Sequence, residues 1–143
     1  MNNIGVYIDA DNVSAESTCN ALKYVESRGN ILFVKGYANW SSKPRQWKTL
    51  CLRWGVKMDH RYNISKTKNC ADIALVVDAT ASLYGGGPCF DTIVVISSDS
   101  DFGPLALQAR ECGKVVVGMG SEKTPSSYVG LCKEFHLFDK LEA

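Results

Sequence analysis

The chain lacks the paired cysteine motifs of a zinc site or a disulfide framework. Its six cysteines lie apart, with no Cys-x-x-Cys pair, which favours reduced residues that act as small apolar filler. No apolar run approaches the roughly 18 residues that a membrane-spanning helix needs, and the N-terminus has no basic segment followed by an apolar core. We therefore expect a protein that crosses no membrane and stays in the cytoplasm.

Motifs for several common kinds of chemistry are missing as well. The sequence has no phosphate-binding P-loop, no Gly-x-Gly-x-x-Gly segment and no Ser-His-Asp or Cys-His arrangement. The sequence therefore gives no support to a nucleotide-binding phosphate loop or to an enzyme that transfers acyl groups. Internal repeats and low-complexity segments are also absent, and the length of 143 residues suits one domain over residues 1–143.

Two apolar, β-branched runs each end in closely spaced carboxylates, at residues 4–12 and 92–102. Such runs are typical of strands that are buried on both faces of a parallel sheet. Four aspartates would then lie just beyond strand ends, where open α/β sheets bind ligands: Asp9, Asp11, Asp99 and Asp101. Because carboxylates at one edge repel each other, we expect a cation between them. Aspartate oxygens without Cys or His partners suit Mg²⁺ or Mn²⁺.

Apolar strands alternate with helices along the whole chain. Strands are expected at residues 4–9, 31–35, 56–60, 92–97, 114–118 and 135–138, and helices at 15–26, 41–54, 70–84, 102–112 and 126–133. Regular alternation with short connections implies a parallel sheet with helices on both faces. The predicted fold is an α/β three-layer sandwich with a mainly parallel central sheet of five to six strands.

The charge is unevenly distributed, although the net charge is only +1. Residues 35–68 carry nine basic side chains and one acidic side chain, a local net charge of +8. An acidic centre beside a basic flank suits metal-dependent phosphodiester chemistry, because metals need carboxylates and a polyanion needs cations. The alternative, that these cations only form solvated faces of a helix and its loops, stays open.

Two acids interrupt the apolar helix expected at residues 70–84. Asp72 either caps the start of this helix, with Asn69 before it, or points to the acidic sheet edge. Asp78 lies about 240° further around the helix, so it does not share a face with Asp72. For Asp78, a functional role and an anchoring role for a basic or backbone partner both stay open.

The aromatic residues of the basic segment fall into two groups. Trp47 and Trp54 belong to an i, i+3, i+4, i+7 stripe, which is typical of the buried side of a helix. Trp40 instead lies in a polar loop among basic residues. Its ring is therefore a candidate for stacking on an unpaired base.

Three segments together carry a family resemblance. They are the D-x-x-N opening at residues 9–12, the K-x-x-x-D…L…D helix at 68–78, and the S-x-D-x-D-F segment at 97–102 with G-K-x-V at 113–116. In this order they resemble the NYN domain family, the LabA-like branch of the PIN-like nucleases. The resemblance covers nearly the whole chain and implies a PIN-like, Rossmann-like fold and metal-dependent cleavage of RNA, with single-stranded RNA as the expected substrate.

The resemblance also implies roles for individual residues. The expected catalytic residues, which would also be the metal ligands, are Asp9, Asp72, Asp99 and Asp101. Supporting roles are expected for Asp11, Asn12, Asp78 and Ser98. The basic segment would hold the RNA, with the predicted contacts Lys43, Arg45, Lys66, Lys68 and Trp40.

Two other functions stay open. The segment Asp9-Ala10-Asp11-Asn12-Val13 also fits the D-x-D-x-[TV] opening of haloacid-dehalogenase-like phosphatases. In such an enzyme Asp9 would be the nucleophile and Asp11 the general acid. The other alternative is a non-catalytic NYN module that binds RNA or a protein partner. A homodimer is left open for each of these functions.

Overall fold

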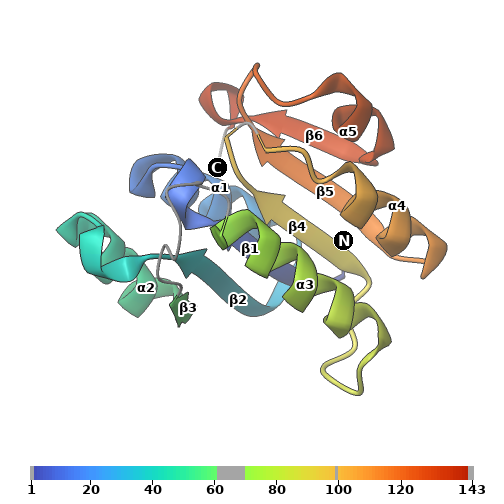
Figure 1. Ribbon diagram of the computed structural model, residues 1–143, viewed down its shortest axis with the longest axis horizontal. Coiled ribbons are helices and arrows are strands. Elements are labelled where there is room, and N and C mark those ends of the chain that lie inside the picture. Colours follow the sequence, from blue (N-terminus) through green and yellow to red (C-terminus); the bar gives the residue numbers. More distant parts are fainter. Residues whose placement is uncertain (1, 61–69, 99, 142–143) are drawn as a thin grey trace.

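The computed structural model describes residues 2–60, 70–98 and 100–141 (Figure 1). The expectations for Lys66, Lys68 and Asp99 therefore fall outside the described residues. The strands are β1 (Asn3–Asp9), β2 (Asn30–Ala38), β3 (Lys57–His60), β4 (Thr92–Ile96), β5 (Val115–Gly120) and β6 (Glu134–Leu137). The α-helices are α1 (Ala15–Arg28), α2 (Arg45–Trp54), α3 (Cys70–Tyr84), α4 (Gly103–Glu111) and α5 (Ser126–Leu131). Short 3₁₀ turns form η1 (Ala10–Asn12), η2 (Trp40–Ser42) and η3 (Phe138–Lys140).

The six strands form one sheet in the order β3-β2-β1-β4-β5-β6, and every neighbouring pair is parallel. The chain builds outward from β1 to β3, then returns to place β4 on the other side of β1. The strand order therefore reverses between β1 and β4, which is where open α/β sheets bind their ligands. The predicted α/β fold with a parallel sheet is confirmed.

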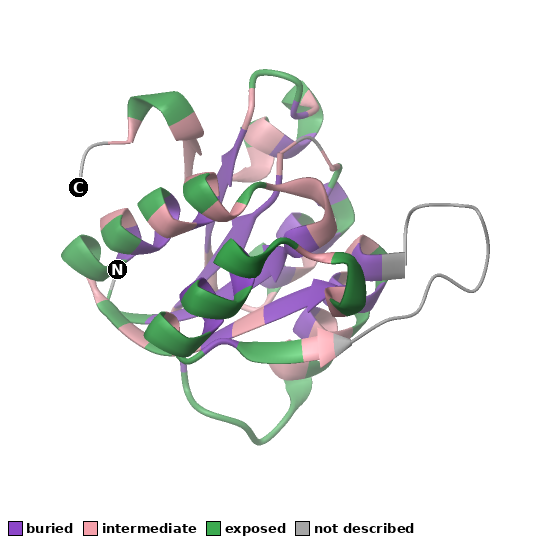
Figure 2. Ribbon diagram, turned by 90° about the vertical axis from the view of Figure 1, so that its left-hand side faces the viewer, coloured by how far each residue is buried: buried purple, intermediate pink, exposed green. Residues whose placement is uncertain are grey.

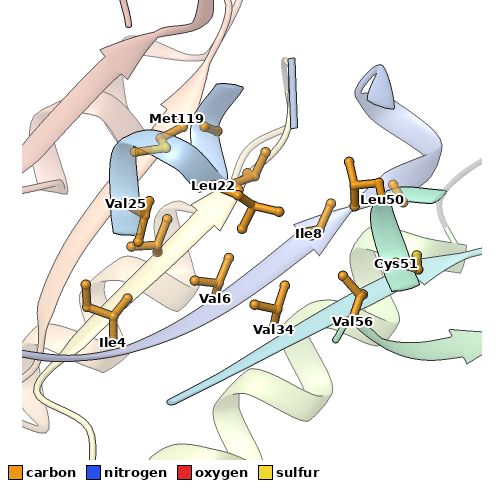
Figure 3. Close-up of a cluster of buried hydrophobic side chains, with 14 of the residues drawn as sticks. Ile4, Val6, Ile8, Leu22, Val25, Val34, Leu50, Cys51, Val56 and Met119 are labelled. Atoms are coloured by element: carbon orange, nitrogen blue, oxygen red, sulfur yellow. The ribbon is translucent and has the colours of Figure 1, made fainter. Parts of the chain in front are cut away.

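Helices cover both faces of the sheet and bury it. On one face α1 and α2 pack on alternate residues of the central strands; Figure 3 shows Leu22 and Val25 above Val6 and Ile8. On the other face α3, α4 and α5 pack on a second cluster that contains Tyr7, Ile93 and Val95. Figure 1 shows α3 and α4 crossing in front of the strands. In Figure 2 the strands are buried between helices whose outer surfaces are exposed.

The segment between β2 and β3 differs from the sequence-based expectation. The strand β2 continues to Ala38, because Gly36 and Tyr37 still pair with both β1 and β3 and Ala38 pairs with β3. The helix α2 begins at Arg45, and residues 40–42 form η2 instead of its first turn. Lys43 precedes Pro44 and is extended, with a ψ of 144°, which is the conformation that a following proline favours. Gly55 ends the helix in a left-handed conformation with a φ of 64°.

Two of the expected absences concern cysteine pairing and membrane spans. The cysteines 19, 51, 89, 112 and 132 are all free. Within the residues that the structure describes, no helix has both the length and the apolar character that a membrane span requires.

Candidate active site

The site is built around Asp9, the last residue of β1. This strand lies inside the sheet between β2 and β4. The side chain of Asp9 has no exposed surface, and Ala10 begins the tight turn η1 directly after it. A central parallel strand thus delivers a carboxylate to the middle of the carboxyl edge of the sheet, between its two halves.

The two carboxylate oxygens of Asp9 have different surroundings. Its Oδ2 accepts hydrogen bonds from Asn12 Nδ2 at 3.0 Å, Ser97 Oγ at 2.9 Å and Ser100 Oγ at 3.1 Å. Its Oδ1 is buried and has no hydrogen-bond partner in the described part of the chain. A buried acceptor without a partner is uncommon and calls for a ligand or an energetic cost. Oδ1 of Asp9 is therefore the atom of this edge that is open to a ligand.

Asp72, in the first turn of α3, acts electrostatically on Asp9. Burial raises the pKa of Asp9, hydrogen bonds from Asn12 and Ser97 lower it, and the negative charge of Asp72 raises it again. Burial also raises the pKa of Asp72, whose Oδ1 accepts the backbone N–H of Ile73 at 2.8 Å. Two partly desolvated carboxylates, one of which acts on the charge of the other, supply oxygen ligands of the type that a hard divalent cation prefers.

Asp101 does not join this pair. Its side chain is exposed, and its Oδ1 accepts the backbone N–H of Gly103 at 2.8 Å, where α4 begins. Its charge acts on the hydroxyl of Tyr128, whose pKa is raised first by burial. Among the described residues, no three His, Cys, Asp or Glu side chains are arranged to hold one metal ion. The predicted cluster of Asp9, Asp72, Asp99 and Asp101 therefore stays a prediction, and the described contact of Asp101 is with the backbone N–H of Gly103.

Asp11 points to the basic segment. Its Oδ1 lies 2.9 Å from Lys43 Nζ, and its Oδ2 accepts the backbone N–H of Asn39 at 3.3 Å. Lys43 Nζ also donates to the carbonyl oxygen of Ala10. These contacts join η1 to the segment after β2, and the charges of Asp11 and Lys43 are paired with each other.

Asp78 anchors α3 to β2. It accepts a hydrogen bond from the hydroxyl of Tyr37 and lies 3.7 Å from Lys35 Nζ. Burial, followed by the contact with Asp78, raises the pKa of Tyr37, and burial raises the pKa of Tyr7 to about 12. Of the two roles left open for Asp78, these contacts favour the anchoring one.

Trp40 is more enclosed than its polar sequence context suggests. The side chain is half-buried, and its indole N–H donates to the carbonyl oxygen of Asp59 at 2.9 Å. Its ring centroid lies 5.8 Å from that of Trp47, and the two rings are at 71° to each other. Trp47 is buried, as its helical spacing predicts. Arg45 is exposed at the start of α2.

Sequence reasoning missed two of the three donors to Asp9. Asn12 was expected as a polar support, whereas Ser97 and Ser100 were given no role beyond their place in the segment 97–102. Ser98, the expected support, contributes its backbone: its carbonyl oxygen accepts from Ser121 Oγ at 2.6 Å and Thr124 Oγ1 at 2.9 Å. The position of Ser97 directly after a buried strand is the sequence feature that could have identified it.

The fold is shared with a protein of unknown function from Vibrio parahaemolyticus. The two structures superpose with a TM-score of 0.72 at 20% sequence identity, over 96% of this chain and 93% of that chain. A biliverdin reductase from Synechocystis, solved with biliverdin and NADP⁺, matches at 14% identity and a TM-score of 0.47, over 94% of this chain and 37% of that chain. This second likeness is too weak to bear on fold or function. No curated protein matches the chain significantly.

The family of the chain follows from a comparison with domain families. The NYN domain model matches residues 3–139, from the first strand to the turn after the last one. The matched range includes Asp9, its three hydrogen-bond donors and Asp72. The chain therefore belongs to the NYN domain family, a family of PIN-like nucleases.

Proposed function

We propose that this protein is a metal-dependent ribonuclease that hydrolyses phosphodiester bonds of single-stranded RNA at the carboxyl edge of its sheet. Membership of the NYN family supports RNA as the class of substrate. The observation that carries the proposal is Asp9, a wholly buried carboxylate with one oxygen fixed by three donors and the other without a partner.

The residues present fit a divalent metal ion. In the proposed site Asp9, Asp72, Asp99 and Asp101 would hold Mg²⁺ or Mn²⁺, and the unpartnered Oδ1 of Asp9 would be the central ligand atom. Asp101 would have to exchange its hydrogen bond with the Gly103 backbone N–H for the metal ion. Such an ion, when bound, lowers the pKa of a water molecule and stabilises negative charge on the phosphoryl group. Asn12, Ser97 and Ser100 hold the other oxygen of Asp9, which fixes the orientation of the carboxylate.

The structure gives the phosphatase alternative no specific support. That mechanism needs Asp11 as a general acid, but Asp11 is ion-paired with Lys43 at 2.9 Å. Its other carboxylate oxygen accepts the backbone N–H of Asn39 at 3.3 Å, so both oxygens of Asp11 have partners within the protein.

The test is incubation of the protein with labelled single-stranded RNA and Mn²⁺ or Mg²⁺, with and without EDTA. We expect cleavage that EDTA stops and that Asp9→Asn abolishes. Asp139→Asn makes the same change at an exposed position in η3 and serves as the matched control. RNA binding without cleavage by the wild-type protein would favour the non-catalytic module, and absence of both would refute the proposal.

A further inference from the structure

A groove lies between α2 and β3, at the edge of the sheet. Its volume is about 460 Å³, within the range of about 300–1,000 Å³ that small-ligand sites occupy. Its walls come from η2, from one side of α2 and from the strand β3, and they include Trp40, Trp47, Val56 and Met58. Figure 1 shows β3 at the border of the sheet, and no strand follows it on this side in the described part of the chain. The groove therefore lies at this border.

The groove has an apolar interior that remains open to solvent. Met58 on β3 is 47% exposed and Leu52 on α2 is 77% exposed, and both line it. The indole of Trp40 is fixed beside them by its hydrogen bond to β3 and by the close approach of Gly36, where an added Cβ would lie 3.1 Å from the ring. An apolar hollow with a rigid aromatic wall favours a flat apolar group over a hydrated ion.

Cations without acidic partners border this apolar interior. Arg45 and Lys48 line the groove and are exposed. Neither side chain takes part in an ion pair with any carboxylate among the described residues. Apolar walls together with unpaired cations are complementary to a group that has a flat apolar body and an attached anion.

The groove adjoins the candidate active site through Lys43. This side chain lines the groove, forms the ion pair with Asp11 and donates to the carbonyl oxygen of Ala10. Ala10 directly follows Asp9 in the chain. If a phosphodiester of an RNA strand lies at Asp9, a neighbouring nucleotide of that strand can therefore reach the groove.

From these observations we propose that the groove between α2 and β3 receives an unpaired base of the RNA, while Arg45 and Lys48 contact its adjoining phosphates. This inference rests on the proposed function and deepens it, because it identifies the feature that selects single-stranded RNA. A base in a duplex is stacked and paired and cannot enter the groove without being extruded. A strand of a second copy, added to the free edge of β3, is the competing occupant.

The first test measures binding, separately from cleavage. Binding of a labelled oligouridylate is measured by fluorescence anisotropy in EDTA, with Asp9→Asn as the background. Met58→Ser should weaken binding about tenfold, because a hydroxyl replaces the apolar contact of the Met58 side chain with the base. Leu107→Ser is the matched control, because Leu107 is 48% exposed on α4, at the other side of the sheet, and it should leave affinity unchanged.

A duplex probe separates base contacts from phosphate contacts. The background protein should bind single-stranded RNA more tightly than duplex RNA, and Met58→Ser should reduce this preference. The double variant Arg45→Ala/Lys48→Ala should lower the slope of log affinity against log salt by about 1.4, for two lost phosphate contacts. Lys23→Ala removes one positive charge from an exposed position of α1 and is the control, because it should leave the salt slope unchanged.

The outcomes distinguish the inference from the proposed function. If Met58→Ser binds RNA like Leu107→Ser while the wild-type protein still cleaves RNA, the groove hypothesis is wrong and the proposed function stands. If Met58→Ser instead converts a dimer into a monomer in light scattering without changing RNA affinity, the second copy is the occupant. If the background protein binds no RNA and the wild-type protein cleaves none, both fall.

Discussion

At the scale of single residues, Asp9 shows how one side chain can be both tightly held and incompletely satisfied. Three hydrogen bonds converge on Oδ2, while Oδ1 is buried without a partner. Burying a charged acceptor without a partner costs folding free energy, on the order of 1–3 kcal/mol or more. The unpartnered Oδ1 of Asp9 therefore lowers the stability of the ligand-free protein, and a bound ligand would remove this cost.

Replacement of this carboxylate should therefore stabilise the metal-free protein. Asp9→Asn removes the buried charge and the repulsion from Asp72, so we expect its unfolding free energy to rise by about 1 kcal/mol. Thermal unfolding with and without Mn²⁺ measures the effect. Manganese should stabilise the wild-type protein and leave Asp9→Asn unchanged, with Asp139→Asn behaving like wild type. Equal metal stabilisation of wild type and Asp9→Asn would exclude Asp9 as a ligand.

Asp91, at the opposite edge of the sheet, should make the free energy of unfolding depend on pH. Its carboxylate accepts hydrogen bonds from the Thr92 hydroxyl at 2.7 Å and the Asn3 backbone N–H at 3.0 Å, and these bonds lower its pKa. A lowered pKa in the folded state stabilises the fold above the pKa of the unfolded chain, and this contribution disappears as pH falls through the folded value.

The variant Asp91→Asn tests this effect. Urea unfolding should show a loss of stability at neutral pH that shrinks below about pH 4, where the unfolded carboxyl group is protonated. Asp139→Asn, with the same charge change, serves as the control. A difference between wild type and Asp91→Asn that does not change with pH would contradict the assignment.

At the scale of elements, Gly120 of β5 allows neighbouring segments to approach the carboxyl edge of the sheet. An added Cβ at Gly120 would lie 2.6 Å from Thr124 Oγ1 and 2.7 Å from the carbonyl oxygen of Ser97. Ser97 is also a donor to Asp9. The backbone that carries this donor is thus in direct contact with β5.

Gly120→Ala should therefore weaken both the fold and the site. We expect a loss of about 1–3 kcal/mol in unfolding free energy, because the carbonyl oxygen belongs to backbone and cannot rotate away. RNA cleavage should fall more than stability alone explains. Gly86→Ala, where an added Cβ has no neighbour within 4 Å, is the matched control for both measurements. Full activity of Gly120→Ala would show that the edge tolerates displacement of Ser97.

The elements themselves were largely predictable, because each depends on local patterns. The helix α3 begins and ends at the predicted residues, and β1 and β4 differ from prediction by one residue at one end. The hydrogen-bond and ion-pair partners of individual side chains could not be predicted in this way. The parallel pairing of β1 with β2 brings the segment after β2 to η1, where Lys43 pairs with Asp11, and the sequence did not predict this ion pair. The contact of Lys43 with RNA stays a prediction.

At the scale of the whole molecule, the site depends on which strands are neighbours. Asp9 and Ser97 are 88 positions apart in sequence and meet because β1 pairs with β4, with Ile8 opposite Ile96. Local patterns predict that both segments are buried strands and that their carboxyl ends share an edge. They do not predict the strand order, so the position of Ser97 after a buried strand marks it as a residue of this edge without identifying Asp9 as its partner.

The seam between β1 and β4 also makes the molecule divisible. All pairing among β1, β2 and β3 is complete before the exposed glycines 85–87, and all pairing among β4, β5 and β6 comes after them. A protein cut at Gly86 should therefore remain associated through this seam, and separately expressed halves should regain RNA cleavage only when mixed. Neither half alone has both Asp9 and Ser97, so enzyme activity would report directly on the reunion of the two fragments.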